Sequence, residues 1–244
     1  MSRSQLSNHI RLMTLADTHP CSYLEGVQSN SVFIDCDTPP SWRQYSELSR
    51  IGFRRSGRHY YRPHCPDCNE CKSVRIRCLE FDLNRKSRKR LLKKGHKLIA
   101  AMEEPVFSLN HYDLYERYVQ ARHSDGDMYP PSMDQYRSFL LDGIPSSRFF
   151  TLRNQKGELK SATLIDVLDD GISAVYTYFD PNDQEFSLGT LAVLKLAELC
   201  KAGRLPYIYL GYWVKNSPKM AYKRKFDPLD VLDNEKWHLL SEEN

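Results

Sequence analysis

The chain has 244 residues, 41% of them hydrophobic, and a formal net charge of +4; this length suits one large domain or two modest ones, and the composition excludes a disordered chain. No apolar run approaches the roughly 18 residues that a membrane span needs, and residues 1–10 lack the apolar core of a signal peptide, so we expect a cytoplasmic protein with no membrane partner. Residues 50–97 carry 16 Lys and Arg against 4 Asp and Glu, a local charge of +12 that leaves −8 for the rest and points to a polyanionic partner.

The first half of the chain predicts short strands and two helices. We expect a strand at 30–35, a helix capped by Ser41, a hairpin over 53–62 and a strand at 74–79. The spacing of leucines over 85–102 predicts a second, basic helix. Pro105 follows two glutamates and interrupts that pattern. We therefore divide the chain into an N-terminal Cys-containing, basic region at 1–104 and a second domain at 105–244.

The second half predicts helices and a three-stranded meander. Helices are expected around 112–119, from Ser132 to Leu141, from Ser187 to Gly203 and, briefly, from Ser217; strands are expected at 148–153, 160–168, 172–179 and 207–211. Two helices, three antiparallel strands, a helix, a strand and a helix follow the order of GNAT-type acyltransferases. The predicted fold is therefore α+β, with a small Cys-containing N-terminal region and a GNAT-like acyltransferase domain.

The most specific short motif is a cysteine triplet. Cys65, Cys68 and Cys71 are spaced so that successive thiolates can face one metal or cluster. A tetrahedral site needs a fourth ligand, for which Cys21 and His64 are the candidates; alternatively, the triplet is three reduced thiols in a tight turn. The remaining cysteines are expected to be structural: Cys36, Cys78 and Cys200.

A run of cations dominates residues 85–97, with eight Lys and Arg in 13 residues and no acid between Asp82 and Glu103. Several cations on one helix face are what phosphate neutralisation needs; the alternative is a solvated helix face. We expect nucleic-acid binding, with Tyr23, Tyr60 and Tyr61 either stacking on bases or half-buried in strands. The predicted tRNA-binding residues in this run are Arg85, Lys86, Arg88, Lys89, Arg90, Lys93 and Lys94.

Further candidates lie in the second half. Ser187 and Gly189 open a helix directly after a strand, where N–H groups attract phosphate or an oxyanion, or where they are an ordinary cap and a packing glycine. Lys219 and Lys223 follow the last predicted strand and join the predicted tRNA contacts. The proposed catalytic residues are Asp125 and Asp127 in one loop, together with Tyr176 and Asp180 on or beyond a meander strand.

Eight strings together resemble one family, the bacterial aspartate/glutamate leucyltransferases, which are relatives of the eukaryotic arginyl-tRNA–protein transferases. The resemblance covers about residues 20–226. The strings are PCSYL (20–24), GFRRSG (52–57), YRPHC (61–65), HSDGDMYPP (123–131), VLDDG (167–171), AVYTYFDP (174–181), YLGYWV (209–214) and KMAYK (219–223).

The resemblance implies transfer of leucine from leucyl-tRNA to proteins that begin with Asp or Glu, which marks them for N-degron proteolysis. It also implies a GNAT-like catalytic half. The eukaryotic relatives bind an iron–sulfur cluster through N-terminal cysteines, and by position Cys21 and the triplet correspond to these. An iron–sulfur cluster or zinc is therefore the candidate cofactor, although the transfer itself requires none.

The chemistry of such a reaction adds one more expectation. The acceptor's carboxylate needs a cation, ideally a bidentate Arg, and Arg54 and Arg55 are the candidates. Its α-amine needs a carboxylate that holds it and takes a proton, for which we expect Asp125 or Asp127, with Asp180 behind them. Two alternatives remain: a CoA-dependent GNAT acetyltransferase, and a nucleic-acid-binding adaptor whose GNAT-like half is inert.

Overall fold

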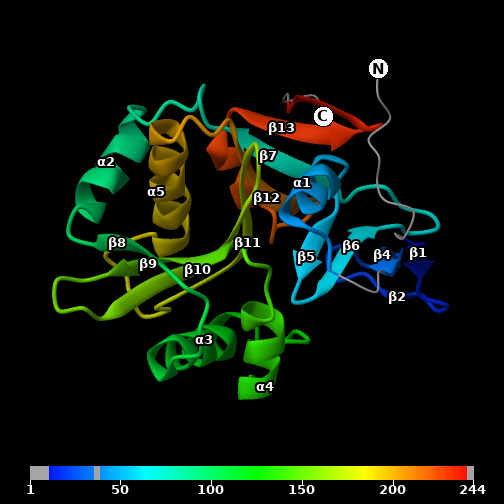
Figure 1. Ribbon diagram of the computed structural model, residues 1–244, viewed down its shortest axis with the longest axis horizontal. Helices are drawn as coiled ribbons and strands as arrows, with labels where there is room; N and C mark the ends of the chain where they lie inside the picture. Colours follow the sequence, from blue (N-terminus) through cyan, green and yellow to red (C-terminus); the bar gives the residue numbers. More distant parts are fainter. Residues whose placement is uncertain (1–10, 36–38, 241–244) are drawn as a thin grey trace.

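The computed structural model describes residues 11–35 and 39–240, which form two sheets, a short strand pair and helices on both sides of the larger sheet (Figure 1). The predicted α+β class is confirmed. None of the helices in these ranges combines the length and apolar character that crossing a bilayer requires. Cys36 lies outside the described residues.

The larger sheet has eight strands, and all its neighbours but one are antiparallel. In spatial order the strands are β14 (Lys236–Leu239), β13 (Leu229–Asp233), β7 (Lys72–Arg77), β12 (Tyr207–Trp213), β11 (Gly171–Phe179), β10 (Leu159–Val167), β9 (Ser147–Arg153) and β8 (Ile99–Glu103). The parallel pair β11 and β12 is joined through α5 (Leu188–Ala202), because parallel neighbours need a crossover. The predicted meander β9–β10–β11 is confirmed.

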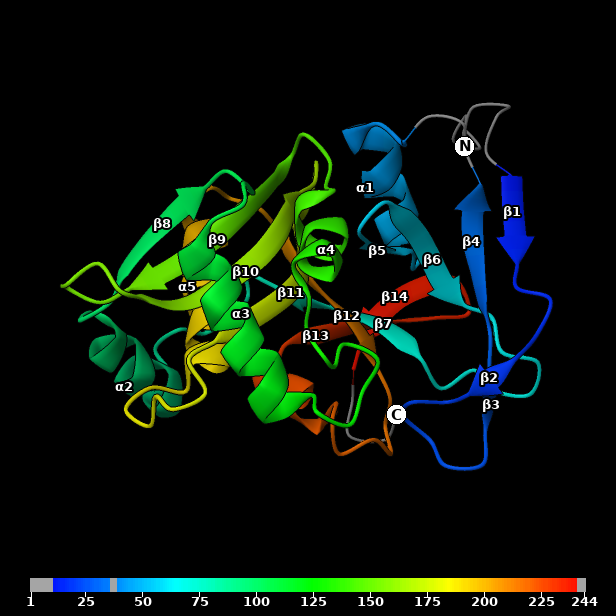
Figure 2. The same cartoon turned by 90° about the horizontal axis from the view of Figure 1, so that it is seen from below.

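Helices cover the two faces of this sheet. The apolar helix α5 packs on one face together with α2 (Lys86–Gly95), around a core that includes Leu191, Ile208 and Trp213. The opposite face carries α3 (Leu109–Arg122), α4 (Met133–Tyr136) and the π-helical turn Arg137–Leu141 (Figure 2). Their core is rich in tyrosine, because β11 directs Tyr176 and Tyr178 to that side. Ser132 caps α4 as predicted, accepting a bond from the Gln135 amide.

The smaller sheet stands at the other end of the molecule from α2 (Figures 1 and 2). Its order is β1 (Arg11–Thr14), β4 (Ser31–Asp35), β6 (His59–Pro63) and β5 (Arg54–Ser56), and a separate pair is formed by β2 (His19–Pro20) and β3 (Gln28–Ser29). Helix α1 (Trp42–Arg50) begins at Ser41, which forms a capping box with Gln44. The buried side chains Tyr45 and Tyr60 join this part to Tyr209 of the larger sheet and to Leu168, directly after β10.

Two sequence predictions of local structure were wrong. The basic helix does not run to residue 102: α2 ends at Gly95, and Ile99–Glu103 is the edge strand β8, paired with β9. Glycine favours ending a helix, and pairing with β9 satisfies the backbone of the following residues. The last helix is a 3-10 helix, η2 (Ala221–Phe226), and a hairpin, β13–β14, that the sequence did not reveal follows it.

Strands from both sides of residue 104 build the larger sheet. β7 lies between β12 and β13, and β8 forms the far edge. The boundary between 1–104 and 105–244 stays a prediction. Strands from the two ranges are hydrogen-bonded in the same sheet. The centre of the molecule is therefore the place where both parts of the chain contribute side chains.

Candidate functional site

The parallel strands β11 and β12 pair only at their beginnings. Their register runs from Gly171 opposite Tyr207 to Ser173 opposite Tyr209, although the strands continue to Phe179 and Trp213. Beyond this point their backbones no longer pair with each other. The interrupted ladder lies at the C-terminal ends of two neighbouring parallel strands, which is where open sheets place ligands.

A bulge in β12 sets which side chains face this interruption. The pairing of β12 with β7 shifts between Tyr209 and Tyr212, and Gly211 within the shift has φ +77°. One extra residue reverses the alternation of the side chains that follow. As a result Tyr212 turns to the side of the smaller sheet, where its hydroxyl lies 2.9 Å from the carbonyl oxygen of Gly52. Trp213 joins the core beneath α5.

Arg54 is a buried cation whose charge has no ion-pair partner in the described residues. Its Nη1 donates to the carbonyls of Ser49 (3.2 Å) and Phe53 (2.7 Å), and its guanidinium lies over the rings of Tyr209 and Tyr212 at 5.3 and 5.8 Å. Within residues 11–35 and 39–240, its Nε and Nη2 have no hydrogen-bond partner. Arg54 therefore keeps one complete edge of its guanidinium available.

Arg55, the next residue, is fully occupied. Its Nε and Nη2 bind the two oxygens of Asp166 at 2.8 and 2.7 Å, and both side chains are 0% exposed. Ser147 and the carbonyl of Gly57 take the remaining contacts. Because Arg55 already holds a carboxylate, its guanidinium has no free edge for the carboxylate of an acceptor, and the acceptor-binding role predicted for this pair stays a prediction for Arg54.

Lys223 lies beside Arg54 and not on the tRNA-facing surface to which the sequence assigned it. It is 5% exposed, and its Nζ donates to the carbonyl of Tyr212. Burial, together with the charge of Arg54, lowers the pKa of Lys223 to about 7. No carboxylate in the described part of the chain pairs with Lys223 or with Arg54. Arg54 and Lys223 therefore both contact Tyr212, the residue directly after the bulge glycine Gly211.

Of the three tyrosines that the sequence predicted to stack on bases, one is buried, one is partly buried and one is exposed. Tyr60 is 2% exposed and packs edge-on against Tyr45 at 5.2 Å, so it is a core residue. Tyr61 is partly buried against Tyr212 at 6.1 Å. Tyr23 is 38% exposed, and burial together with nearby Tyr61 raises its pKa to about 12.

The loop that carries Asp125 and Asp127 approaches β11 and the segment before η2. Asp125 lies 3.5 Å from the Nζ of Lys219, and both side chains are largely exposed. Asp127 is also exposed. The hydroxyl of Tyr176 lies 3.5 Å from the Sδ of Met128 in the same loop, and burial raises the pKa of Tyr176. The fold thus gathers residues that the sequence singled out separately.

Asp180 is held by two cations. Arg117 and Lys160 bind its two oxygens at 3.2 and 3.1 Å. Burial opposes ionisation of Asp180, but the hydrogen bonds from Lys160 and the Asn182 amide, together with the charges of Lys160 and Arg117, outweigh it and lower the pKa of Asp180. A carboxylate held in its ionised form this strongly is a poor proton acceptor, so Asp125 and Asp127 are the better candidates for the base.

At the start of α5, Gly189 has the packing role that was one of the two alternatives read from the sequence. A Cβ at Gly189 would lie 3.2 Å from the Phe179 ring, so glycine allows the helix to approach the end of β11. Ser187 precedes the helix and is exposed, without a side-chain capping bond. A phosphate-binding role for these two residues stays a prediction.

The basic helix α2 exposes most of its cations. The residues that are exposed and form no ion pair within the described chain are Arg85, Lys86, Lys89, Arg90, Lys93 and Lys94. Lys97 instead pairs with Glu185 at 2.6 Å. Arg88 is 6% exposed, lies 3.8 Å over Phe81, and donates to the carbonyls of Asp82 (2.9 Å) and Lys225 (3.1 Å). Arg88 is therefore a structural residue rather than a surface cation.

The four candidate metal ligands lie near one another without forming a metal site. Burial raises the pKa of Cys71 to about 12, with contributions from Cys21, Cys65 and Cys68, which are therefore close by. All four are free thiols. No group of three or more His, Cys, Asp or Glu side chains in residues 11–35 and 39–240 is arranged to hold a metal ion. The predicted zinc or iron–sulfur site is not supported.

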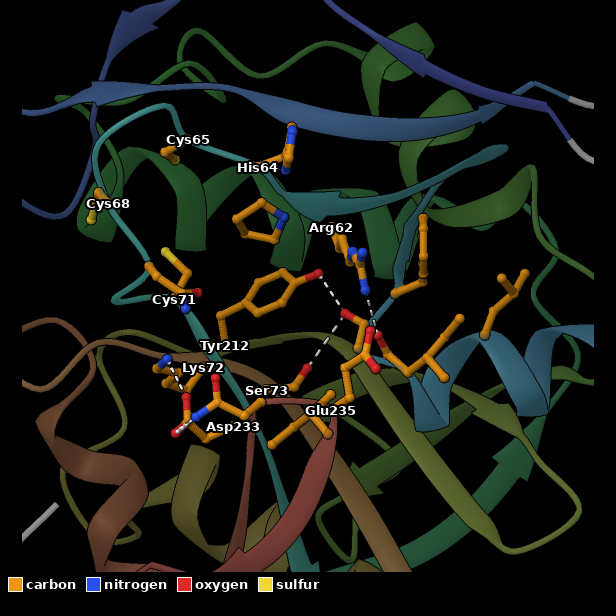
Figure 3. Close-up of a pocket in the computed structure, with 18 of the residues that line it drawn as sticks. Arg62, His64, Cys65, Cys68, Cys71, Lys72, Ser73, Tyr212, Asp233 and Glu235 are labelled. Carbon is orange, nitrogen blue, oxygen red and sulfur yellow. Dashed lines mark hydrogen bonds and ion pairs between the residues drawn. The ribbon is translucent and has the colours of Figure 1, made fainter. Parts of the chain in front are cut away.

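The cysteine loop instead borders a cavity of about 1000 Å³. Figure 3 shows Tyr212 between this loop and Ser73, with Arg62 and Glu235 on the far wall. Cys78 and Cys200, in contrast, are completely buried, as expected of structural cysteines. Sequence reasoning missed Tyr212 as the link between the cavity and the buried cations, although a glycine inside a strand pattern is a known sign of a bulge.

Comparison with known proteins finds relatives that match most of the chain. The family description "Arginine-tRNA-protein transferase, C terminus" matches residues 110–233, and "Arginine-tRNA-protein transferase, N terminus" matches residues 19–89. A protein of Pseudomonas aeruginosa named aspartate/glutamate leucyltransferase is 45% identical over 91% of this chain and 94% of its own. A protein of the same name from Alcanivorax borkumensis is 46% identical over 93% of each chain.

Similarity to solved structures is weaker. The C-terminal domain of a putative lysylphosphatidylglycerol synthetase from Agrobacterium fabrum is 13% identical, with a TM-score of 0.46 over 78% of this chain and 64% of that one. Such a score does not establish a shared fold. The sequence matches, in contrast, extend over both sheets and the site between them, and they show that the chain belongs to the arginine-tRNA-protein transferase family, among the aspartate/glutamate leucyltransferases.

Proposed function

We propose that this protein transfers leucine from leucyl-tRNA to the N-terminal α-amine of proteins that begin with Asp or Glu. The product carries an N-terminal leucine and is thereby marked for N-degron proteolysis. The observation that carries the proposal is the match, along almost the entire chain, to relatives named aspartate/glutamate leucyltransferase. Charged tRNA as the donor favours a cytoplasmic location for this activity.

The reaction needs no cofactor. The aminoacyl ester of the tRNA is already activated: the acceptor amine attacks its carbonyl carbon, the C–N bond forms, and the C–O bond to the tRNA ribose breaks. The attacking amine loses a proton, which Asp125 or Asp127 is placed to accept, and the leaving ribose oxygen gains one. The exposed cations of α2 and Lys219 would hold the tRNA backbone.

We place the chemistry in a GNAT-like arrangement. The meander β9–β10–β11, the crossover helix α5 and the parallel strand β12, whose ladder with β11 is interrupted, are consistent with the acyltransferase order read from the sequence. In this arrangement the ester would lie beside the interrupted ladder, with Tyr176 on β11 and the bulge of β12 on its two sides.

An assay with charged tRNA tests this proposal. The purified protein is incubated with leucyl-tRNA and a peptide beginning with Asp, and the peptide is analysed by mass spectrometry. We expect addition of one leucine residue, and no modification when acetyl-CoA replaces the tRNA. A CoA-dependent acetyltransferase gives the opposite pattern, and a nucleic-acid-binding adaptor modifies no peptide with either donor.

A further inference from the structure

Two buried cations meet at Tyr212 and lack a counter-charge in the described chain. Arg54 is 5% exposed and lies over the ring of Tyr212, while Lys223, also 5% exposed, bonds to its carbonyl oxygen. They come from different elements, β5 and η2, and within the described part of the chain their side chains donate hydrogen bonds to backbone carbonyls. Keeping the charge of Arg54 out of water is costly unless an anion binds to it, and such an anion would also favour the charged form of Lys223.

Arg55 shows what the vacant edge of Arg54 is able to bind. Arg55 holds the carboxylate of Asp166 through its Nε and Nη2, at 2.8 and 2.7 Å. The same two nitrogens of Arg54 are the buried donors without a partner. This edge of a guanidinium matches the two oxygens of a carboxylate. The chain thus contains, in adjacent residues, one filled and one vacant carboxylate-binding edge.

We propose that Arg54 and Lys223 together bind the side-chain carboxylate of the acceptor's first residue. This inference rests on the proposed function and names the residues that select Asp and Glu. The guanidinium of Arg54 supplies the two-pronged contact, and the ammonium of Lys223 supplies a second charge. Tyr209 and Tyr212 provide aromatic walls against the guanidinium.

The burial of both cations favours a carboxylate over a tRNA phosphate. A backbone phosphate lies between two sugars and cannot leave the strand to reach two buried cations, whereas an Asp or Glu side chain ends in its carboxylate. The exposed cations of α2 are the better match for phosphates.

Transfer to matched peptides tests the proposal. Peptides that differ only in beginning with Asp or Asn are leucylated by the wild type, Arg54→Gln and Lys223→Met, and kcat/KM is measured for each. We expect each variant to lower the Asp-over-Asn ratio by at least about tenfold, the effect of losing a charge-assisted hydrogen bond. The control is Lys225→Met, an exposed lysine on the same 3-10 helix, which should keep the wild-type ratio.

The outcomes separate this inference from the proposed function. If the wild type leucylates no peptide, the proposed function is wrong. If the wild type is active and both variants keep its Asp-over-Asn ratio, the carboxylate is read elsewhere and this inference is wrong. If the variants lose affinity for leucyl-tRNA while that ratio stays unchanged, the pair binds the tRNA instead.

A second measurement needs no substitution and therefore does not depend on the variants folding. The wild type is treated with an amine-directed acylating reagent, and modification of Lys223 is followed by peptide mass spectrometry. The Asp peptide should protect Lys223 and the Asn peptide should not. Equal modification in the presence of either peptide would overturn the proposal.

Discussion

Arg55 and Asp166 form a two-pronged ion pair from which water is completely excluded, with both side chains 0% exposed and N–O distances of 2.7 and 2.8 Å. The pair joins β5 of the smaller sheet to β10 of the larger one. Removing one member of a buried pair leaves an uncompensated charge, which typically costs about 3–5 kcal/mol.

We therefore predict that Arg55→Met lowers the free energy of unfolding by about 3–5 kcal/mol. Urea denaturation of both proteins measures this difference. The control is Lys219→Met, which removes one member of the exposed pair with Asp125 and should change stability by less than about 1 kcal/mol. A loss as small for Arg55→Met would show that the buried pair is not important for stability.

The exposed cations of α2 should set the salt dependence of tRNA binding. We predict that Lys89→Glu/Lys93→Glu weakens binding of leucyl-tRNA and lowers the slope of log K against log salt by about 2, because each phosphate contact contributes slightly less than one. The control is Lys156→Glu/Lys236→Glu, an equal charge change at exposed positions outside α2.

If both double variants bind equally well at every salt concentration, α2 is not part of the tRNA surface. Arg88 is unsuitable for this experiment. It is buried and bonded to backbone carbonyls, so its replacement would change folding as well as charge.

Lys223 should make stability depend on pH above neutrality. Burial lowers its pKa to about 7 from 10.5, so between these values the unfolded chain binds a proton that the folded chain does not. The free energy of unfolding then rises with pH in this window, by at most about 1.4 kcal/mol per pH unit. The groups near Lys223 are Arg54, Cys71, Tyr222 and the carbonyl of Tyr212.

Lys223→Met should remove this component, while Lys225→Met, at an exposed position, should keep it. Denaturation measured from pH 7 to 10 gives the slope for all three proteins. The same slope in Lys223→Met as in the wild type would show that Lys223 is charged in the folded protein throughout this range.

The bulge at Gly211 should matter for activity beyond its effect on stability. Gly211 has φ +77°, and Gly157, in a turn between β9 and β10, has φ +83° with open space around it. Alanine at either position is strained by about 1–2 kcal/mol. We predict similar losses of stability for Gly211→Ala and Gly157→Ala, but a fall in leucine transfer only for Gly211→Ala.

Transfer and unfolding measured on both variants check this prediction. Equal activity of the two variants would mean that the course of β12 beyond the bulge does not position the reacting groups. A fall in activity in both would point to a general effect of lost stability.

Local patterns in the sequence determined much of this protein. The meander, the capped helix α1, the apolar helix α5 and the family resemblance could all be read from spacing and from short strings, because these depend on residues close together in the chain. The strand β8 and the hairpin β13–β14 could not, since short strands at the edge of a sheet take their structure from the strands that pair with them.

Only the tertiary structure decided which cations are free. Arg54 and Arg55 look alike in the sequence, but neighbouring residues of a strand face opposite sides. Arg55 meets Asp166, a residue 111 positions away, while Arg54 meets tyrosines and Lys223. Likewise Arg88 and Lys223 belong to basic runs but are buried by distant elements. The sequence therefore determined where positive charge gathers along the chain, and three-dimensional packing decided which charges lie on the surface, which stabilise the fold, and which remain without a counter-charge in the interior.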